Sequence, residues 1–376
     1  MVYNEYGKTG KKLSVVGNGG TKRFNKELSI EENAEVLLYS FEQGINHFDT
    51  CYFYNHTNCE DIYGHAIKQM KRNTFYSSSK ACPLGPMNCD TKEKARTAVS
   101  QSLERMNLDK FDFYYLWQVK TMNEYEIAMR PGGLMEGLMD LKDEGLIGHI
   151  LFSAHMPGDE IVPILDTGTF EGVLLNMNIL NFPYTLSAAK HAKKLGLGVG
   201  VMSPLAGGLI PQHQDRLNIH ISDNETLTES AIKFITHLPW VDFAYFGMRS
   251  KDEIDNVCKC AEGESVLSDA EIKDIQMKIG EGLNNACTSC MYCMDVCPNN
   301  VPIAAYMQLY NMVYIFNEPE EKFKGNLKFS RNWMSLASRK AEAKDCIHCG
   351  ECEKACTQKL NIVERIRRIA EYESSF

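Results

Sequence analysis

The sequence has no long apolar run and a deficit of positive charge. No apolar stretch among its 376 residues approaches the roughly 20 residues of a membrane span. The opening segment, MVYNEYGKTGKK, lacks the apolar region of a secretion signal. With 40 Lys and Arg against 49 Asp and Glu, the net charge is −9, which disfavours nucleic acid as a partner. We therefore expect a globular protein that uses neither a membrane nor a nucleic acid.

Cysteine, by contrast, is abundant. Fourteen cysteines without a secretion signal indicate a reducing cytoplasm rather than a disulfide framework. Eight of them form two copies of C-x2-C-x2-C-x3-C near the C-terminus, the spacing with which bacterial ferredoxins bind 4Fe–4S clusters. Zinc sites usually pair two C-x2-C knuckles, so this spacing favours two 4Fe–4S clusters over zinc. In two-cluster ferredoxins the fourth cysteine ligates the other cluster, so we expect Cys297 to complete the second site and Cys356 the first. The predicted ligands are Cys287, Cys290, Cys293, Cys297, Cys346, Cys349, Cys352 and Cys356.

The region before these cysteines alternates between two kinds of segment. From residue 13 to about 262, short apolar runs alternate with amphipathic stretches, the pattern of βα units around a parallel sheet. Eight such units fit a closed (β/α)8 or TIM barrel, an α/β fold of about 250 residues. A doubly wound open sheet is the rival, but no G-x-G-x-x-G follows the first strand. The predicted strands are 13–17, 45–49, 74–79, 111–116, 149–153, 172–176, 198–202 and 241–246.

The part of the chain after the barrel has helical patterns. Ser268 and Glu271 form a capping box that opens a helix. The long segment between the two cysteine groups is also helical in pattern, so we expect two clusters held between helices. The predicted domains are a barrel over 1–265 and an α-helical ferredoxin-like domain over 266–376. The predicted helices around the cysteines are 303–316, 327–341 and 362–372.

Ionisable side chains follow several of the predicted strands. In a (β/α)8 enzyme the reactive groups lie at the C-terminal ends of the strands. The second strand ends at Asp49, and its loop carries Tyr52 and Tyr54. The third strand ends at Lys80 and the fourth at Trp117. We expect these side chains to meet at one end of the barrel.

These segments resemble the aldo/keto reductase family. Residues 44–54, GINHFDTCYFY, look like that family's G-x-x-x-x-D-S/T-A-x-x-Y, and residues 60–64, EDIYG, are similar to its following E-E-x-x-G. The resemblance implies an oxidoreductase with Asp49, Tyr54 and Lys80 as catalytic residues. The C-terminal cysteines point to the iron–sulfur branch of this family, and the resemblance then covers nearly the whole chain.

The residue types suit proton transfer to a carbonyl group. A free tyrosine has a pKa of about 10, which is too high for effective acid/base work at neutral pH. A nearby ammonium lowers that pKa, and a carboxylate holds the ammonium in place. Tyr54 would act as general acid/base, tuned by Asp49 and Lys80, while hydride reaches the carbon. We expect the substrate to be a small aldehyde, ketone or sugar-like carbonyl compound.

One position departs from the family's pattern. The family usually has a histidine five residues after an aspartate like Asp112, whereas this chain has Trp117, followed by Gln118. Tryptophan donates one hydrogen bond but cannot exchange a proton at neutral pH. Trp117 would therefore position the substrate. His155, after the fifth strand, would substitute in part for the missing histidine or would be an ordinary polar loop residue.

The resemblance also implies a nicotinamide site with departures of its own. Residues 202–208, MSPLAGG, resemble the loop that embraces the pyrophosphate, where small residues let backbone N–H groups approach. Arg249 suits the 2′-phosphate of NADP(H) through its forked donors. Glu253 replaces the usual Gln or Arg, Asn256 sits one residue early, and Leu174 stands where the nicotinamide amide is commonly bound. The implied cofactor-binding residues are Ser153, Ser203, Leu205, Gly207, Arg249, Glu253 and Asn256.

Three functions remain open from the sequence. Nicotinamide moves two electrons as hydride, a 4Fe–4S cluster moves one, and no flavin motif stands between them. The chain would be an NADP-dependent carbonyl reductase whose clusters serve a partner or the fold. Alternatively, it would be a nicotinamide-independent single-electron reductase, radical or flavin-assisted, fed by the clusters. As a third possibility it would be an electron-transfer subunit. A ferredoxin or flavodoxin is the expected electron carrier.

Overall fold

The fold was determined as a computed structural model, which describes most of the chain. The described residues are 1–20, 27–54, 58–84, 87–215, 217, 219, 221–263, 266–282, 286–287, 289–314, 319–337, 339–356 and 358–375. Among these residues, no helix is long and apolar enough to cross a membrane.

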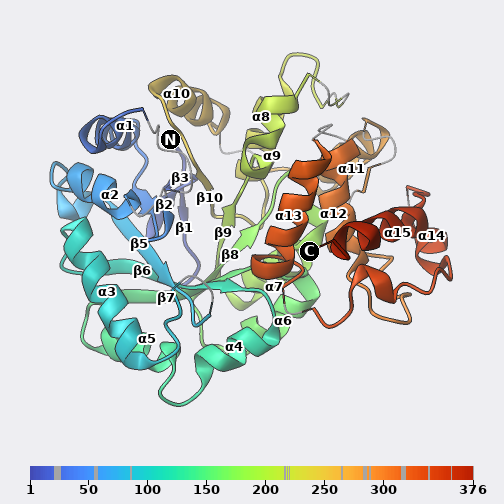
Figure 1. The fold of residues 1–376 in the computed structure, drawn as a ribbon. Helices are drawn as coiled ribbons and strands as arrows, with labels where there is room; N and C mark the ends of the chain where they lie inside the picture. Colours follow the sequence, from blue (N-terminus) through green and yellow to red (C-terminus); the bar gives the residue numbers. More distant parts are fainter. Residues whose placement is uncertain are drawn as a thin grey trace.

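Eight parallel strands close into a barrel (Figure 1). Each strand pairs with the next along the chain, and the last, β10, pairs with β3 to complete the ring. This confirms the predicted (β/α)8 barrel. The barrel strands are β3 (Val16–Gly19), β4 (His47–Asp49), β5 (Tyr76–Ala81), β6 (Phe111–Val119), β7 (Ile147–Ala154), β8 (Gly172–Asn176), β9 (Gly198–Met202) and β10 (Phe243–Phe246).

Helices surround the barrel and bury an apolar face against it. The first of them begins with a capping box: the Ser29 Oγ accepts the N–H of Glu32 at 3.1 Å, and the Glu32 carboxylate accepts the N–H of Ser29 at 2.7 Å. Such a box satisfies two N–H groups that the helix itself leaves without partners. The surrounding helices are α1 (Ile30–Glu42), α2 (Cys59–Ile67), α3 (Lys92–Met106), α4 (Met122–Met129), α5 (Leu134–Asp143), α6 (Gly158–Leu165), α7 (Leu186–Leu195), α8 (Leu209–His213), α9 (Leu227–Thr236) and α10 (Lys251–Cys260).

The first predicted strand is two strands in the structure. β2 (Lys12–Ser14) pairs antiparallel with β1 (Tyr3–Glu5), and the chain bends at Val15 before it enters the barrel. Leu13 packs with Tyr6 in a buried cluster that belongs to this hairpin and the barrel interior. The prediction of one barrel strand here was wrong, because a single apolar run serves both the hairpin and β3.

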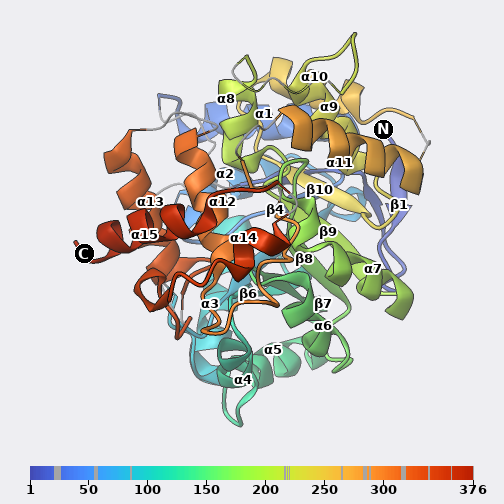
Figure 2. The ribbon, with the colours of Figure 1, turned by 90° about the vertical axis from the view of Figure 1, so that its right-hand side faces the viewer.

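The C-terminal helices gather on one side of the barrel (Figures 1 and 2). α11 (Asp269–Gly282) begins at the predicted capping box, where the Glu271 N–H donates to the Ser268 Oγ at 3.3 Å. Its Ile272 and Ile275 pack into the same apolar cluster as the barrel core. The domain boundary after residue 265 stays a prediction. The helices that follow are α12 (Ile303–Tyr314), α13 (Glu320–Trp333), α14 (Glu351–Ala355) and α15 (Ile362–Glu373).

These last helices build a core of their own. Phe323, Leu327 and Ile366, from α13 and α15, are buried together with Tyr310 of α12. The predicted helices at 303–316 and 362–372 correspond to α12 and α15, although residues 315 and 316 lie outside the described residues.

The predicted helix at 327–341 was wrong in its bounds. α13 begins at Glu320, after Pro319 as N-cap, and ends at Trp333. Acidic residues in the first turn favour this start because they complement the helix dipole. The periodicity of the sequence continues past the real end of the helix, where the chain turns.

The C-terminal region docks on the end of the barrel at which the strands terminate. Tyr184, in the short helix after β8, is buried in the apolar cluster that includes Cys287 and Cys293. Arg339 donates to the Glu160 carboxylate, on α6 after β7, at 2.8 Å. The cysteine-bearing region therefore packs against βα loops, the part of such a barrel that carries reactive groups.

Candidate active site

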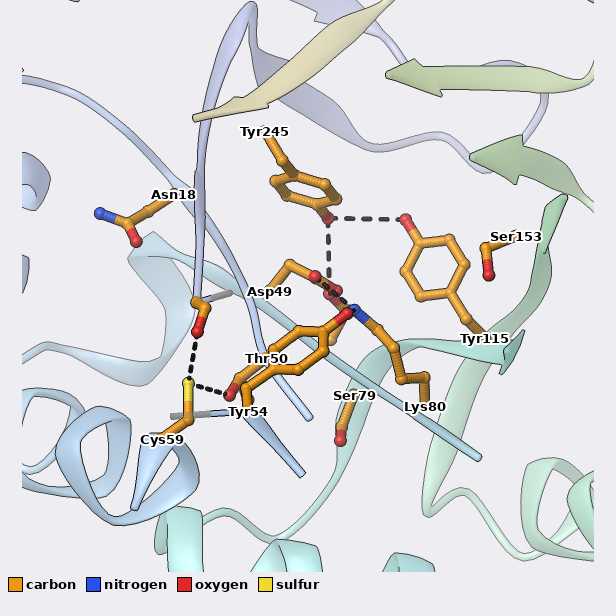
Figure 3. Close-up of polar contacts among 12 residues, drawn as sticks. Asn18, Asp49, Thr50, Tyr54, Cys59, Ser79, Lys80, Tyr115, Ser153 and Tyr245 are labelled. Atoms are coloured by element: carbon orange, nitrogen blue, oxygen red, sulfur yellow. Dashed lines mark hydrogen bonds and ion pairs between the residues drawn. The ribbon is translucent and has the colours of Figure 1, made fainter. Parts of the chain in front are cut away.

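Three of the predicted catalytic residues meet in the interior of the barrel (Figure 3). Asp49 is the last residue of β4, Lys80 lies in β5, and Tyr54 lies in the loop after β4. The Lys80 Nζ donates to Asp49 Oδ2 at 2.5 Å and to the Tyr54 hydroxyl at 3.2 Å. The Lys80 and Asp49 side chains are only 1% and 5% exposed. The ammonium is thus held between a carboxylate and a phenol, away from water.

Two residues that the sequence did not single out support this group. Ser78 lies two positions before Lys80 in β5, so both side chains point to the same face of the strand. Its hydroxyl donates to Asp49 Oδ1 at 2.7 Å and lies 3.4 Å from the hydroxyl of Tyr245. The alternation within the predicted strand could have identified Ser78. Tyr245 comes from the far end of the barrel sequence, and nothing local links it to Asp49.

Burial and the neighbouring charges together set the protonation of these groups. Burial raises the pKa of Asp49, and the Lys80 ammonium opposes that rise. Burial alone would lower the pKa of Lys80, but the pKa is raised, because the charges around the ammonium, Asp49 first, outweigh burial. Burial raises the pKa of Tyr54 more than Lys80 lowers it. Tyr54 is therefore a neutral phenol with a proton to donate, although the ammonium acts in the predicted direction.

The ring of Trp117 packs against the ring of Tyr54. The two rings meet edge to face, with centroids 5.8 Å apart. The strand register shifts between Leu116 and Val119, and Gln118 at this bulge has a φ of 62°. Bulges at strand ends redirect side chains. The Gln118 N–H donates to the Ser153 hydroxyl at 3.0 Å, which ties β6 to β7 at this point.

Residues 60–64, EDIYG, lie in α2 and contact the strand that carries Lys80. The carboxylate of Glu60 accepts the hydroxyl of Ser79 at 2.9 Å and the Nε–H of Arg105 at 2.7 Å. Gly64 lets α2 pack closely on α3, because a Cβ at this position would lie 2.3 Å from the carbonyl oxygen of Arg105. Glu60 thus ties α2 to β5, next to Lys80, and to α3.

The loop after β9 contains several residues with positive φ angles. Ser203, Ala206 and Gly207 have φ angles of 57°, 51° and 69°. Within the described part of the chain, no atom outside its immediate neighbours lies within 4 Å of the position that a Cβ of Gly207 would take, so this turn is open. Positive φ angles in short succession turn N–H groups to one side, as in anion-binding nests. Leu205, also predicted, lies inside this loop and packs against the barrel core.

After β10, the predicted phosphate-binding residue Arg249 is paired with another predicted residue, Glu253. The Glu253 carboxylate accepts the backbone N–H of Arg249 at 2.7 Å and pairs with its guanidinium at 3.3 Å. Arg249 therefore already has an anionic partner, and a phosphate would have to compete with this carboxylate. Asn256 lies one turn further along α10, and its amide oxygen lies 3.9 Å from the Sγ of Cys260.

The eight predicted cluster cysteines border two hollows. Cys287, Cys290 and Cys293 line one hollow together with Cys356, from the second copy of the motif. The other hollow has the opposite combination, with Cys297 joining the second group. Apolar side chains such as Ile362 and Ile366 complete the linings. Each hollow thus brings four cysteine side chains together in an apolar pocket, which suits an iron–sulfur cluster. The second hollow is bordered by Cys297, Cys346, Cys349 and Cys352.

Known proteins match both parts of the chain. The profile of the aldo/keto reductase family matches residues 16–279, and that of the 4Fe-4S dicluster domain matches residues 286–361. L-galactose dehydrogenase of Arabidopsis thaliana is 26% identical over 291 residues, which cover 70% of this chain and 90% of that protein. The NADH-specific methylglyoxal reductase of Escherichia coli (strain K12) is 27% identical over 207 residues, covering 51% of this chain and 62% of that protein.

Solved structures agree on the fold. The aldo-keto reductase AKR11C1 from Bacillus halodurans, in its holo form, superposes with a TM-score of 0.63 at 21% identity, covering 74% of this chain and 96% of that chain. Thermostable aldo-keto reductase Tm1743 gives a TM-score of 0.62 at 20% identity, covering 74% of this chain and all of that chain (100%). The protein therefore belongs to the aldo/keto reductase family and is an oxidoreductase that carries a C-terminal 4Fe-4S dicluster domain.

Proposed function

We propose that the barrel reduces a small or sugar-like carbonyl compound by hydride transfer, with Tyr54 as the proton donor. The observation that carries this proposal is the buried ammonium of Lys80, 2.5 Å from Asp49 and 3.2 Å from the Tyr54 hydroxyl. As the carbonyl oxygen gains negative charge, the neutral phenol gives it a proton. The ammonium then stabilises the phenolate that remains, and Asp49 keeps the ammonium charged and in place.

Trp117 takes the place of a second polar group in this site. Its ring packs directly against that of Tyr54, so a substrate bound at the phenol would also lie beside the indole. The indole N–H can donate one hydrogen bond and cannot transfer a proton at neutral pH. Trp117 thus positions the substrate, and Tyr54 alone transfers the proton. The relative named L-galactose dehydrogenase supports a sugar-like substrate for this chain as well.

The hydride donor in this proposal is a nicotinamide dinucleotide. When bound, it supplies two electrons and a hydrogen to the carbonyl carbon. Ser203, Leu205 and Gly207 would hold the pyrophosphate, and Arg249 and Asn256 the adenosine end. Ser153 would face the nicotinamide. We propose NADP(H), as the forked donors of Arg249 favour, with Glu253 moving away from the guanidinium when a 2′-phosphate binds.

The cysteines would hold two 4Fe–4S clusters with crossed ligation. Each hollow combines three cysteines of one motif with the fourth of the other. Such clusters pass one electron at a time and require a reducing setting, which we propose to be the cytoplasm. A ferredoxin or flavodoxin would exchange electrons with the second cluster, since Cys349 beside it is exposed.

A second candidate function is single-electron reduction fed by the clusters. It is favoured by the packing of Tyr184, which follows a barrel strand, in the same core as Cys287 and Cys293. In this case no nicotinamide would be needed. An anaerobic titration of the reconstituted protein with NADPH and with NADH separates the two candidates, when nicotinamide fluorescence and cluster absorbance are followed together. Binding without bleaching of the clusters supports the hydride enzyme, and no binding of either nucleotide refutes it.

A further inference from the structure

Two polar side chains at the mouth of the barrel have buried atoms without partners. Both ring nitrogens of His155 and the Oε1 of Gln118 are buried and make no hydrogen bond within the described part of the chain. Burying a polar atom without a partner is unfavourable, so buried polar atoms are almost always hydrogen-bonded. Three such atoms at one place in a candidate active site indicate a ligand that pairs with them.

The two side chains come from adjacent strand ends. Gln118 lies near the end of β6, and His155 directly follows β7. The His155 N–H donates to the carbonyl oxygen of Val119 at 2.9 Å, next to Gln118. Trp117, which stands against Tyr54, is the other neighbour of Gln118. Both residues thus lie at the mouth of the barrel, and the Lys80 ammonium, which bonds the Tyr54 hydroxyl, is near enough to lower the pKa of His155.

The backbone of Gln118 supports a role in binding. Its φ of 62° lies in the left-handed region, which is unfavourable for a residue with a side chain. Such strained residues are concentrated at functional sites. The strand bulge and the bond from the Gln118 N–H to the Ser153 hydroxyl hold this conformation. The backbone is thus held in a fixed conformation, while the amide oxygen has no partner among the described residues.

The chemistry of these atoms selects a neutral group. Burial, together with the charges of Lys120 and Lys80, lowers the pKa of His155 to about 4, so the ring is neutral near pH 7. Both lysines are already paired: Lys120 with Glu124 at 2.9 Å and Lys80 with Asp49. A carboxylate or phosphate would find no free cation here. A neutral imidazole offers one donor and one acceptor, and an amide oxygen offers an acceptor.

We propose that His155 and Gln118 form a subsite for a hydroxyl group of the substrate, next to the carbonyl held at Tyr54. A hydroxyl donates one hydrogen bond and also accepts, so it can donate to the amide oxygen while it accepts from the N–H of the neutral imidazole. The preferred substrates are then hydroxyaldehydes or hydroxyketones rather than plain alkyl carbonyls. This inference rests on the proposed carbonyl reduction and defines its substrate class.

The kinetic test compares two substrates that differ in their hydroxyls. Glyceraldehyde and propanal have the same carbon chain, and both are assayed anaerobically with the intact holoenzyme and NADPH or NADH. We expect His155→Ala to lower kcat/KM for glyceraldehyde by about tenfold, the order of one lost hydrogen bond in a site. Propanal should change by less than about twofold. His191→Ala, at a surface histidine paired with Asp166, is the matched control and should change neither.

Gln118→Asn tests the second half of the subsite. Asparagine tolerates the left-handed backbone but carries a shorter amide. It should lower the glyceraldehyde preference and leave propanal unchanged. An equal loss for both substrates in His155→Ala and Gln118→Asn would overturn the inference. So would a weaker dissociation constant for the nucleotide with an unchanged substrate preference, because the two side chains would then serve the cofactor.

A binding measurement makes the inference independent of turnover. The protein is titrated with glycerol and with 1-propanol, the reduced forms of the two substrates. Binding is followed by intrinsic fluorescence, to which Trp117 contributes. The wild-type protein should bind glycerol more tightly, and His155→Ala should remove that difference. If neither aldehyde is reduced but the glycerol preference is present, carbonyl reduction fails and the hydroxyl subsite stands. If both aldehydes are reduced without any glycerol preference, the subsite fails alone.

Discussion

The Lys80 ammonium and the Asp49 carboxylate form an almost completely buried ion pair, with nitrogen and oxygen 2.5 Å apart. Removing one member of such a pair leaves an uncompensated charge in a low-dielectric interior, which costs about 3–5 kcal/mol. The pair therefore contributes to the fold as well as to the proposed chemistry. Both the stability and the activity of each variant must be measured.

Lys80→Met should therefore lower both stability and activity. We expect a loss of about 3–5 kcal/mol in the free energy of unfolding and a fall in kcat of about 10²–10⁴-fold, because the proton donor loses its partner. Urea unfolding and anaerobic turnover measure the two effects. Lys193→Met is the control, since Lys193 pairs with Asp242 at 2.6 Å outside the site. If Lys193→Met reduced kcat as strongly as Lys80→Met, the loss would reflect stability alone.

The cluster cysteines should act in crossed pairs. Cys287→Ser, Cys356→Ser and the double variant should all lose the same cluster, so their iron contents should be equal. Combining Cys346→Ser with Cys356→Ser should remove both clusters. Iron analysis and electron paramagnetic resonance of the reduced protein measure this, with Cys258→Ser as a control that retains its iron. Additive losses in the Cys287/Cys356 double variant would contradict crossed ligation.

Glu253 should control the preference between the two nucleotides. In Glu253→Gln the Arg249 guanidinium loses its partner, so we expect the Kd for NADPH to fall by about tenfold and that for NADH to stay nearly constant. Fluorescence titration measures both constants. Asp252→Asn removes a charge from the same turn of α10 without touching Arg249 and serves as the control. Equal changes for both nucleotides would show that Arg249 does not meet a 2′-phosphate.

A buried histidine should make the barrel sensitive to acid. Burial lowers the pKa of His47 to about 3, against the opposing effect of its bond to the Ser14 carbonyl. The unfolded chain takes up this proton below pH of about 6.5 and the folded chain does not, so stability is present above that pH and is lost as the pH falls. Between pH 7.5 and 5 the loss is about 2 kcal/mol.

His47→Gln removes the side chain that takes up this proton when the chain unfolds. Its unfolding free energy, measured anaerobically in urea, should fall between pH 7.5 and 5 by about 2 kcal/mol less than that of the wild-type protein. The same pH dependence in wild type and His47→Gln would mean that His47 is not the group that titrates.

The sequence predicted local features well where one short pattern decides them. The capping box of Ser268 and Glu271 is present, because it involves only neighbouring residues. The barrel was predictable from alternation along the chain, and Asp49 and Lys80 fell at its strand ends. The break at Val15 was not, because whether an apolar run continues as one strand depends on the tertiary packing of Leu13.

Interactions between distant parts of the chain could not be predicted. Tyr245 reaches Ser78 across the barrel, 167 residues away in sequence. The pairing of Glu253 with Arg249 is local, but its effect on a phosphate depends on rotamers that a motif does not specify. The net pKa of Tyr54 likewise depends on how deeply the site is buried, which the residue types do not reveal.

The central claim is that Tyr54 donates the proton in a hydride-transfer reduction, and Tyr54→Phe tests it most directly. Tyr52→Phe is the matched control, because Tyr52 lies two residues away and stacks on Arg105 rather than on Lys80. Anaerobic oxidation of NADPH and NADH is measured with glyceraldehyde and propanal. We predict that Tyr54→Phe lowers kcat by about 10²–10⁴-fold with nucleotide binding unchanged, and that Tyr52→Phe retains activity. Full activity in Tyr54→Phe would contradict the account.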